Sequence, residues 1–234
     1  MLPSPVKSTS NPIYLHRRKW QGRVGLSLAA ALSVLAGMTD AIGFMATGDF
    51  VSFMSGNTTR LAVAISDADI GTSARLLLAI FTFIAGNALG VIVARLGGRR
   101  ALPLLLCIGT LLCAAAAFPL DSRILTIVAA ILAMGMLNAA VEQVNGLPVG
   151  LTYVTGALSR FGRGLGRWML GERRDGWRVQ LVPWAGMFVG AVVGAWLEHH
   201  LGLNALLVSG GFAALLGLAT LKIPYRWQRR YMPR

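Results

Sequence analysis

The chain has 234 residues, of which 55% are hydrophobic and only 13% are charged, and its mean hydropathy is +0.63. This composition excludes an ordinary soluble domain and is typical of a polytopic membrane protein. The formal net charge of +13 does not indicate nucleic-acid binding, because Lys and Arg collect at the ends of apolar segments, as topology determinants do.

The chain divides into two polar ends and one long apolar region. Residues 1–23 are polar and then basic, without a signal-peptide cleavage site, so we expect a disordered cytoplasmic tail. We expect a single membrane domain over 24–221 and a second basic cytoplasmic tail over 222–234. A membrane-spanning helix needs about 20 apolar residues. Six stretches are long enough, at 24–46, 74–95, 101–118, 124–144, 180–198 and 203–221.

Two further apolar segments, 50–66 and 150–162, are short or interrupted by polar residues and an Arg. We expect both to enter the membrane without crossing it. The chain is then an all-α polytopic protein of six transmembrane helices and two short re-entrant helices, with both termini cytoplasmic. The alternative is eight spans, and the distribution of basic residues fits both topologies equally well. The compact basic hairpin at 95–100 and the shortness of the second segment favour six.

An internal repeat relates residues about 24–118 to residues about 124–221. The segment "AGMTDAIGF" (36–44) aligns with "MGMLNAAVE" (134–142), and the two short segments align with each other. The matched pairs, at offsets of 98 to 104, are Gly37/Gly135, Asp40/Asn138, Ser55/Thr155, Gly56/Gly156, Arg60/Arg160, Gly86/Gly190 and Gly90/Gly194.

The number of crossings in each unit decides how the two copies are oriented. A unit with three crossings places its second copy upside down, so six crossings predict a 3+3 inverted repeat, whereas eight predict a 4+4 parallel repeat. Inverted repeats are usual in secondary transporters, whose substrate sites lie near the midplane where half-length helices meet. Polar, non-helical backbone at that depth is tolerated where protein or a watery cavity surrounds it.

Three blocks of residues resemble a known family. Gly37-x-x-Asp40-Ala41, "FMSGNT" (53–58) and "TYVTG" (152–156) resemble the YoaK-like family of bacterial inner-membrane proteins, the domain of unknown function numbered 1275. The resemblance covers about residues 24–221. Ser55 departs from it, standing where we expect the Thr of a TGN block. The resemblance implies a multi-spanning protein of the bacterial inner membrane, sometimes labelled a small-molecule transporter, and it supplies no substrate.

The candidate substrate-binding residues lie in the first span and in the two short segments. Asp40 is deep in the first span, where an ionisable group costs about 2.5–3.5 kcal/mol. It is either a proton, cation or substrate site, or a carboxylate that caps a helix break or pairs with Arg60; we expect Asn57 or Arg60 within its reach. The full candidate set is Asp40, Ser55, Gly56, Asn57, Thr58, Arg60, Asn138, Thr155, Gly156 and Arg160.

No catalytic set is recognisable within the spans, because the three His residues lie at helix ends or in the tail. We therefore expect no enzymatic activity, no cofactor and no metal. The sequence favours a small-molecule transporter or channel with a polar midplane site between the two repeats. The alternative is a non-transporting membrane protein with an assembly or lipid-interacting role. The expected partners are the lipid bilayer and a small molecule, not nucleic acid, and homo-oligomerisation is left open.

Overall fold

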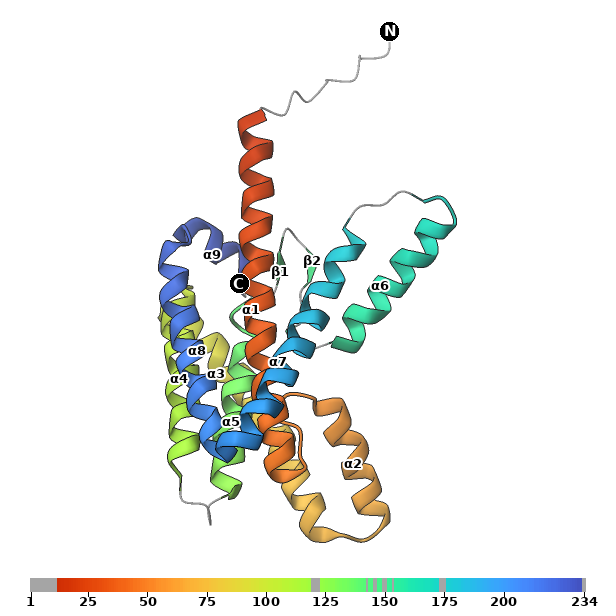
Figure 1. Ribbon diagram of the computed structural model, residues 1–234, viewed down its shortest axis with the longest axis vertical. Helices are drawn as coiled ribbons and strands as arrows, with labels where there is room; N and C mark the ends of the chain where they lie inside the picture. The colour runs from red at the N-terminus through yellow and green to blue at the C-terminus, as the bar shows by residue number, and fades with distance from the viewer. Residues whose placement is uncertain are drawn as a thin grey trace.

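The computed structural model describes residues 12–118, 123–141, 143–144, 147–148, 151–152, 154–172 and 176–232. Over these residues the chain is helical, apart from one antiparallel pair of two-residue strands, β1 (Gln143–Val144) and β2 (Leu147–Pro148). The helices lie side by side in a bundle, from which α2 and α6 diverge obliquely (Figure 1). Their bounds are α1 (Pro12–Thr47), α2 (Met54–Ser66), α3 (Ile70–Leu96), α4 (Ala101–Ala117), α5 (Arg123–Leu137), α6 (Val154–Met169), α7 (Leu181–Leu201), α8 (Ala205–Ala219) and α9 (Tyr225–Tyr231).

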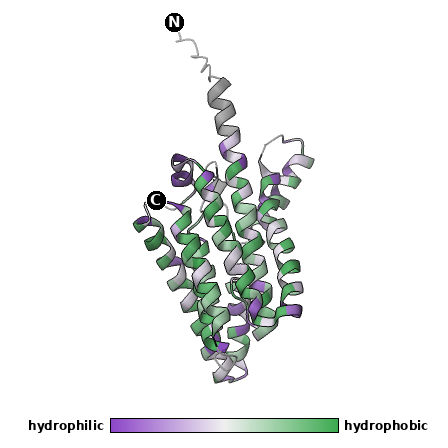
Figure 2. Cartoon of the chain, turned by 60° about the vertical axis from the view of Figure 1, so that its left-hand side comes forward, coloured by the Kyte–Doolittle hydropathy of each residue, from purple (hydrophilic) through white to green (hydrophobic). Residues whose placement is uncertain are grey.

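Three helical stretches of the described chain are long and apolar enough to cross a membrane, namely Trp20–Thr47, Ile70–Leu96 and Trp177–Lys222. The last of these contains both α7 and α8. Helices α4 and α5 are shorter apolar helices. Large apolar side chains lie exposed on the outer faces, among them Phe81 at 65% and Trp196 at 59% exposure, and hydrophobic colouring runs along the helices (Figure 2). The expectation of an all-helical membrane protein is confirmed at this level.

Several boundaries differ from those expected. The expected span 124–144 is too long, because α5 ends at Leu137 and the amides of 138–140 bond in turns to the carbonyls of 135–137. Helix α1 begins at Pro12, inside the expected N-terminal tail, and α9 lies inside the expected C-terminal tail. Polarity alone suggested tails, yet Lys and Arg are good helix formers, so a helix can continue beyond an apolar segment.

Helices α1 and α7, and likewise α3 and α5, approach each other closely because glycines face the neighbouring backbone. A methyl group at any of these glycines would overlap the facing chain, as is usual where small residues let membrane helices pack. The contacts pair Gly190 with Val34, Gly194 with Met38 and Gly37 with Met187 between α1 and α7, and Gly86 with Leu132, Gly90 with Met136 and Gly135 with Phe83 between α3 and α5.

The two sets of contacts correspond to each other under the sequence alignment. Positions in α1 and α5 differ by 98, as for Val34 and Leu132, and positions in α3 and α7 differ by 104, as for Gly86 and Gly190. The first helix of each half therefore packs on the later helix of the other half. Helix α4 packs on α8, where Gly109 faces Gly210.

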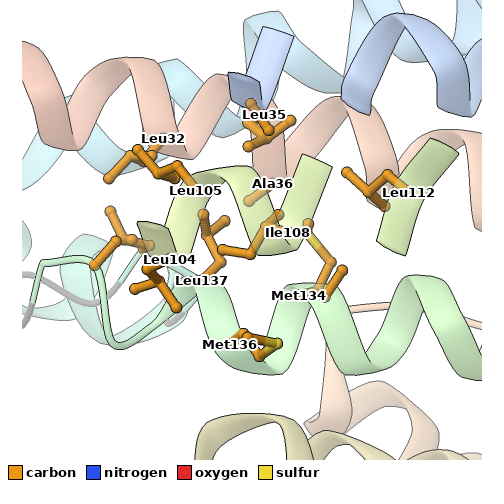
Figure 3. Close-up of a cluster of buried hydrophobic side chains, with 14 of the residues drawn as sticks. Leu32, Leu35, Ala36, Leu104, Leu105, Ile108, Leu112, Met134, Met136 and Leu137 are labelled. Atoms are coloured by element: carbon orange, nitrogen blue, oxygen red, sulfur yellow. The ribbon is translucent and has the colours of Figure 1, made fainter. Parts of the chain in front are cut away.

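The apolar core lies where α1, α4 and α5 meet. Ten of its fully or almost fully buried side chains are labelled in Figure 3, and they are Leu32, Leu35, Ala36, Leu104, Leu105, Ile108, Leu112, Met134, Met136 and Leu137. Because these helices belong to both halves of the chain, the two halves share this core instead of forming separate domains.

Helix α9 joins distant parts of the chain at one end of the bundle, which we call the terminal end. The Tyr231 hydroxyl donates to the carbonyl of Gln21 at 2.6 Å, and the Tyr225 hydroxyl donates to the carbonyl of Gly98 at 2.8 Å. The Gln228 side-chain oxygen accepts from the amide of Ala101 at 2.9 Å. Gln21 of α1, the α3–α4 turn and α9 therefore lie together, and the α2–α3 turn lies at the opposite end (Figure 1).

Candidate functional site

Asp40 holds the loop that leads into α2. Its side chain is buried, and Oδ1 accepts hydrogen bonds from the amides of Val51 and Ser52, each at 2.7 Å. The expectation that Asn57 or Arg60 would be its partner is wrong. A carboxylate oxygen that accepts two amides satisfies two buried donors at once, so Asp40 fixes the returning loop directly.

Asn57 and Thr58 bond within their own segment. The fully buried Asn57 side chain accepts from the amide of Phe50 at 3.2 Å and donates to the carbonyl of Phe50 at 2.7 Å. The exposed Thr58 hydroxyl donates to the carbonyl of Met54, one turn earlier in α2. Gly56 faces the rings of Phe50 and Phe53. Asn57 therefore closes the loop before α2, much as a backbone pair would.

Arg60 pairs with Asp49 in place of Asp40. Its Nη1 lies 2.7 Å from Asp49 Oδ1, while Arg75 Nε lies 2.6 Å from Asp49 Oδ2, and the Asp49 side chain is only 1% exposed. Arg60 also donates to the carbonyl of Gly48. Sequence reasoning missed Asp49, because a carboxylate that follows Gly48 at the end of an apolar span resembles an ordinary interfacial residue.

The second half makes the matching contacts with neutral groups. Asn138, which aligns with Asp40, accepts at Oδ1 from the Thr152 hydroxyl at 3.1 Å. Thr152 aligns with Ser52, so both contacts join the same two positions of the repeat. Arg160, which aligns with Arg60, donates from Nε to the Gln180 side-chain oxygen at 2.7 Å.

The beginnings of α2 and α6 meet at one pocket of about 170 Å³. From these neighbouring starts the two helices run away from each other (Figure 1). Hydroxyls from matched positions of the repeat line the pocket, together with apolar side chains and one glycine. The lining residues are Ser52, Thr152, Ser55, Thr155, Phe53, Met54, Phe83, Val154 and Gly156.

Of the residues chosen from the sequence, Ser55, Thr155 and Gly156 line this pocket. Sequence reasoning missed the deeper hydroxyls Ser52 and Thr152, although both stand in the repeated blocks. The other candidates are not among its lining residues, and they are Asp40, Gly56, Asn57, Thr58, Arg60, Asn138 and Arg160.

Two buried polar atoms near the pocket, Ser52 Oγ and Asn138 Nδ2, make no hydrogen bond of ordinary geometry with the described residues. Ser52 is only 3% exposed, and its hydroxyl lies beside the Asp40 carboxyl group. An unsatisfied buried polar group costs about 1–3 kcal/mol, so such atoms mark places where a bound molecule improves the hydrogen bonding. Among the described residues, no three His, Cys, Asp or Glu side chains are grouped as metal ligands.

The exposed apolar helices, the close glycine contacts and the shared core define an integral membrane protein with several spans. The family described as "Protein of unknown function (DUF1275)" matches residues 28–219. A UPF0700 transmembrane protein of Rhizobium meliloti (strain 1021) is 51% identical over 216 residues, which are 92% of this chain and 94% of the relative. No solved structure matches the chain. The chain belongs to the DUF1275 family, as its glycine and polar motifs indicated.

Proposed function

We propose that the protein moves a small solute across the bacterial inner membrane through the pocket between α2 and α6. The observation that carries the proposal is the composition of that pocket, which takes matched residues from both halves of the chain. In transporters built from inverted repeats, substrates bind where half-length helices of the two repeats meet near the midplane. Ser52 and Thr152, and Ser55 and Thr155, supply such a paired lining.

The same proposal includes six crossings, by α1, α3, α4, α5, α7 and α8, arranged as a 3+3 inverted repeat. The reciprocal glycine contacts support it, because a twofold axis that exchanges the halves also exchanges α1–α7 with α5–α3. Helices α2 and α6 begin at a common pocket and run toward opposite ends of the bundle (Figure 1). This is the geometry of two re-entrant helices that enter from opposite faces.

Charge at the far ends of the two short helices supports the orientation. Helix α2 is followed by the exposed carboxylates Asp67 and Asp69, whereas α6 carries exposed Arg163 and Arg167 on its last turns. Lys and Arg accumulate on the cytoplasmic side of membrane proteins. The far end of α6 and the terminal end of the bundle, with both chain termini, are then cytoplasmic, and the α2–α3 turn faces outward.

Cysteine labelling tests this topology. Single cysteines replace Asp67 and Arg100 in a background without Cys107 and Cys113; Asp69 is kept, because its side chain accepts from the Thr72 amide and caps α3. An impermeant maleimide added to intact cells is expected to label position 67 and not position 100. Labelling of 100 but not 67 would contradict six crossings and favour the eight-span parallel repeat.

Blocking the pocket tests transport itself. Gly156 lines the pocket, and among the described residues beyond its own helix backbone a Cβ there would meet the Arg160 side chain, at 3.4 Å, so Gly156→Leu adds bulk without a backbone clash. Gly162→Leu on the same helix is the control, because no described residue outside the local helix backbone lies within 4 Å of a Cβ at that position. Both variants are expected to be monodisperse and to melt within a few degrees of the wild type.

Proteoliposomes supply the transport measurement, with glycerol, urea, potassium chloride and potassium formate as probes. At least one probe is expected to enter wild-type and Gly162→Leu vesicles faster than protein-free vesicles, and Gly156→Leu is expected to remove that entry. Equal entry into all vesicles, with or without protein, would contradict the proposal and favour a non-transporting assembly or lipid-interacting role.

A further inference from the structure

We infer that the pocket between α2 and α6 binds a small uncharged solute bearing hydroxyl or amide groups, an inference that rests on the proposed function. Four hydroxyls line the pocket, Ser52 and Ser55 from the first half and Thr152 and Thr155 from the second. A hydroxyl both donates and accepts hydrogen bonds, so this set suits groups that also do both. The rings of Phe53 and Phe83 lie beside them and suit the carbon skeleton of such a solute.

Among the described residues that line the pocket, none has a charged side chain. The aligned arginines of α2 and α6 bond outside the lining, Arg60 to Asp49 and Arg160 to Gln180. An ion that enters the pocket loses hydration and meets no charged side chain in the lining, and this is costly at low dielectric. The composition of the lining therefore favours an uncharged ligand over a cation or an anion.

Several amides around the beginning of α2 are already paired within the protein. The amides of Val51 and Ser52 donate to Asp40, and the amide of Phe50 donates to Asn57. The amides of Gly56 and Asn57 donate to the Phe53 carbonyl. The Asp40 carboxyl group thus binds two amides of the loop before α2.

The buried hydroxyl of Ser52 is a separate reason to expect a ligand in the pocket. Ser52 is only 3% exposed and lines the pocket; among the described residues its Oγ makes no hydrogen bond of ordinary geometry, although the Asp40 carboxyl group lies beside it. A hydroxyl or amide of the solute would satisfy this atom without bringing a charge into the membrane. Water would satisfy it in the empty protein.

Stopped-flow light scattering of proteoliposomes tests the inference. Glycerol and urea are the uncharged probes; potassium formate and potassium chloride, each with valinomycin to carry potassium, are the charged ones. Glycerol or urea is expected to enter at least about tenfold faster than in protein-free vesicles, and the salts at the protein-free rate. Ser52→Ala is expected to slow uncharged entry at least about fivefold, as for the loss of one hydrogen bond.

Ser209→Ala is the matched control, because Ser209 is also buried, with an unpaired Oγ, and it lies on α8 away from the pocket lining. It is expected to leave entry unchanged. Thr155→Val provides a second test at an exposed position, where a folding defect is not expected, and it should also slow entry. Equal slowing by Ser209→Ala, or no slowing by either pocket variant, would overturn the inference.

The outcomes separate the inference from the proposed function. Entry of formate or chloride in preference to glycerol and urea overturns the uncharged ligand and leaves transport standing. A second outcome is that no probe enters, but glycerol raises the melting temperature of the wild type and not that of Ser52→Ala. This outcome overturns transport and retains the ligand class. Absence of both entry and differential stabilisation overturns both.

Discussion

In the first half of the molecule, Asp40 accepts two loop amides and Asp49 lies between Arg60 and Arg75. In the second half, Asn138 accepts a single hydroxyl, from Thr152, and Arg160 meets the neutral Gln180. Both arrangements bring the beginning of a short helix to the same pocket.

The difference shows that aligned positions of the two halves share geometry and not chemistry. A carboxylate in one half and an amide in the other both join the end of a long helix to the loop before a short helix. The buried charge in the first half is consequently not required by the fold as such, since the second half reaches the matching position without it. Contacts that the halves share should respond alike to substitution, and contacts that differ should respond differently.

The largest effects are expected at the shared glycine contacts. Gly86→Leu and Gly190→Leu each place a side chain into the backbone of the facing helix, at Leu132 and Val34 respectively. Both variants are expected to yield almost no monodisperse protein in size-exclusion chromatography, because overpacked helices must separate. Gly211→Leu on α8 is the control, because no described residue outside the local helix backbone lies within 4 Å of a Cβ there. If one of the two glycine variants gives monodisperse protein and the other does not, the two halves are not equivalent at these contacts.

Intermediate effects are expected where the halves differ at the loop. Asp40→Ala leaves the buried amides of Val51 and Ser52 without an acceptor, at about 1–3 kcal/mol each. Asn138→Ala leaves only the Thr152 hydroxyl without its acceptor, and the free energy of unfolding is expected to fall by about 1 kcal/mol. In detergent, the melting temperature of Asp40→Ala is expected to lie well below that of Asn138→Ala, with Asp40→Asn between them. Equal melting temperatures for the three variants would show that the Asp40 charge contributes nothing to stability.

The smallest effects are expected at the arginine contacts. Asp49→Ala removes the partner of two guanidinium groups whose side chains are 38% and 41% exposed, so water compensates in part and we expect a loss of about 1–2 kcal/mol. Gln180→Ala is expected to cost about 1 kcal/mol. Only the Asp49→Ala loss should shrink in 1 M salt, where ion pairs are screened within about 3 Å. A salt-independent loss at Asp49 would remove the electrostatic distinction between the halves.

Much of the fold was readable from local sequence. Apolar length predicted the long helices, and the aligned glycines Gly86 and Gly190 lie at corresponding helix contacts. The unusual run of polar residues after Met54 and its counterpart after Tyr153 drew attention to the segments that meet at the pocket. Such features are visible because helix length, small-residue spacing and polar interruptions are properties of neighbouring residues.

Particular partners within the site were not readable in this way. Asp40 was expected to meet Asn57 or Arg60, yet it bonds backbone amides of the loop, and backbone amides carry no signature in a sequence. Arg75 comes 26 residues after Asp49, on another helix, and nothing local announces their contact. Ser52 was missed because its burial depends on how the loop turns back.

By itself, the sequence determined the membrane class, the family and the polar character of the two short segments, because each follows from composition or local pattern. Only the tertiary structure decided that Asp49 and not Asp40 pairs with Arg60, and that four hydroxyls from two segments about 100 residues apart form one lining. The physical reason is that burial and hydrogen-bond partners are set by the packing of α1 on α7 and of α3 on α5, which brings together loops that are remote in sequence.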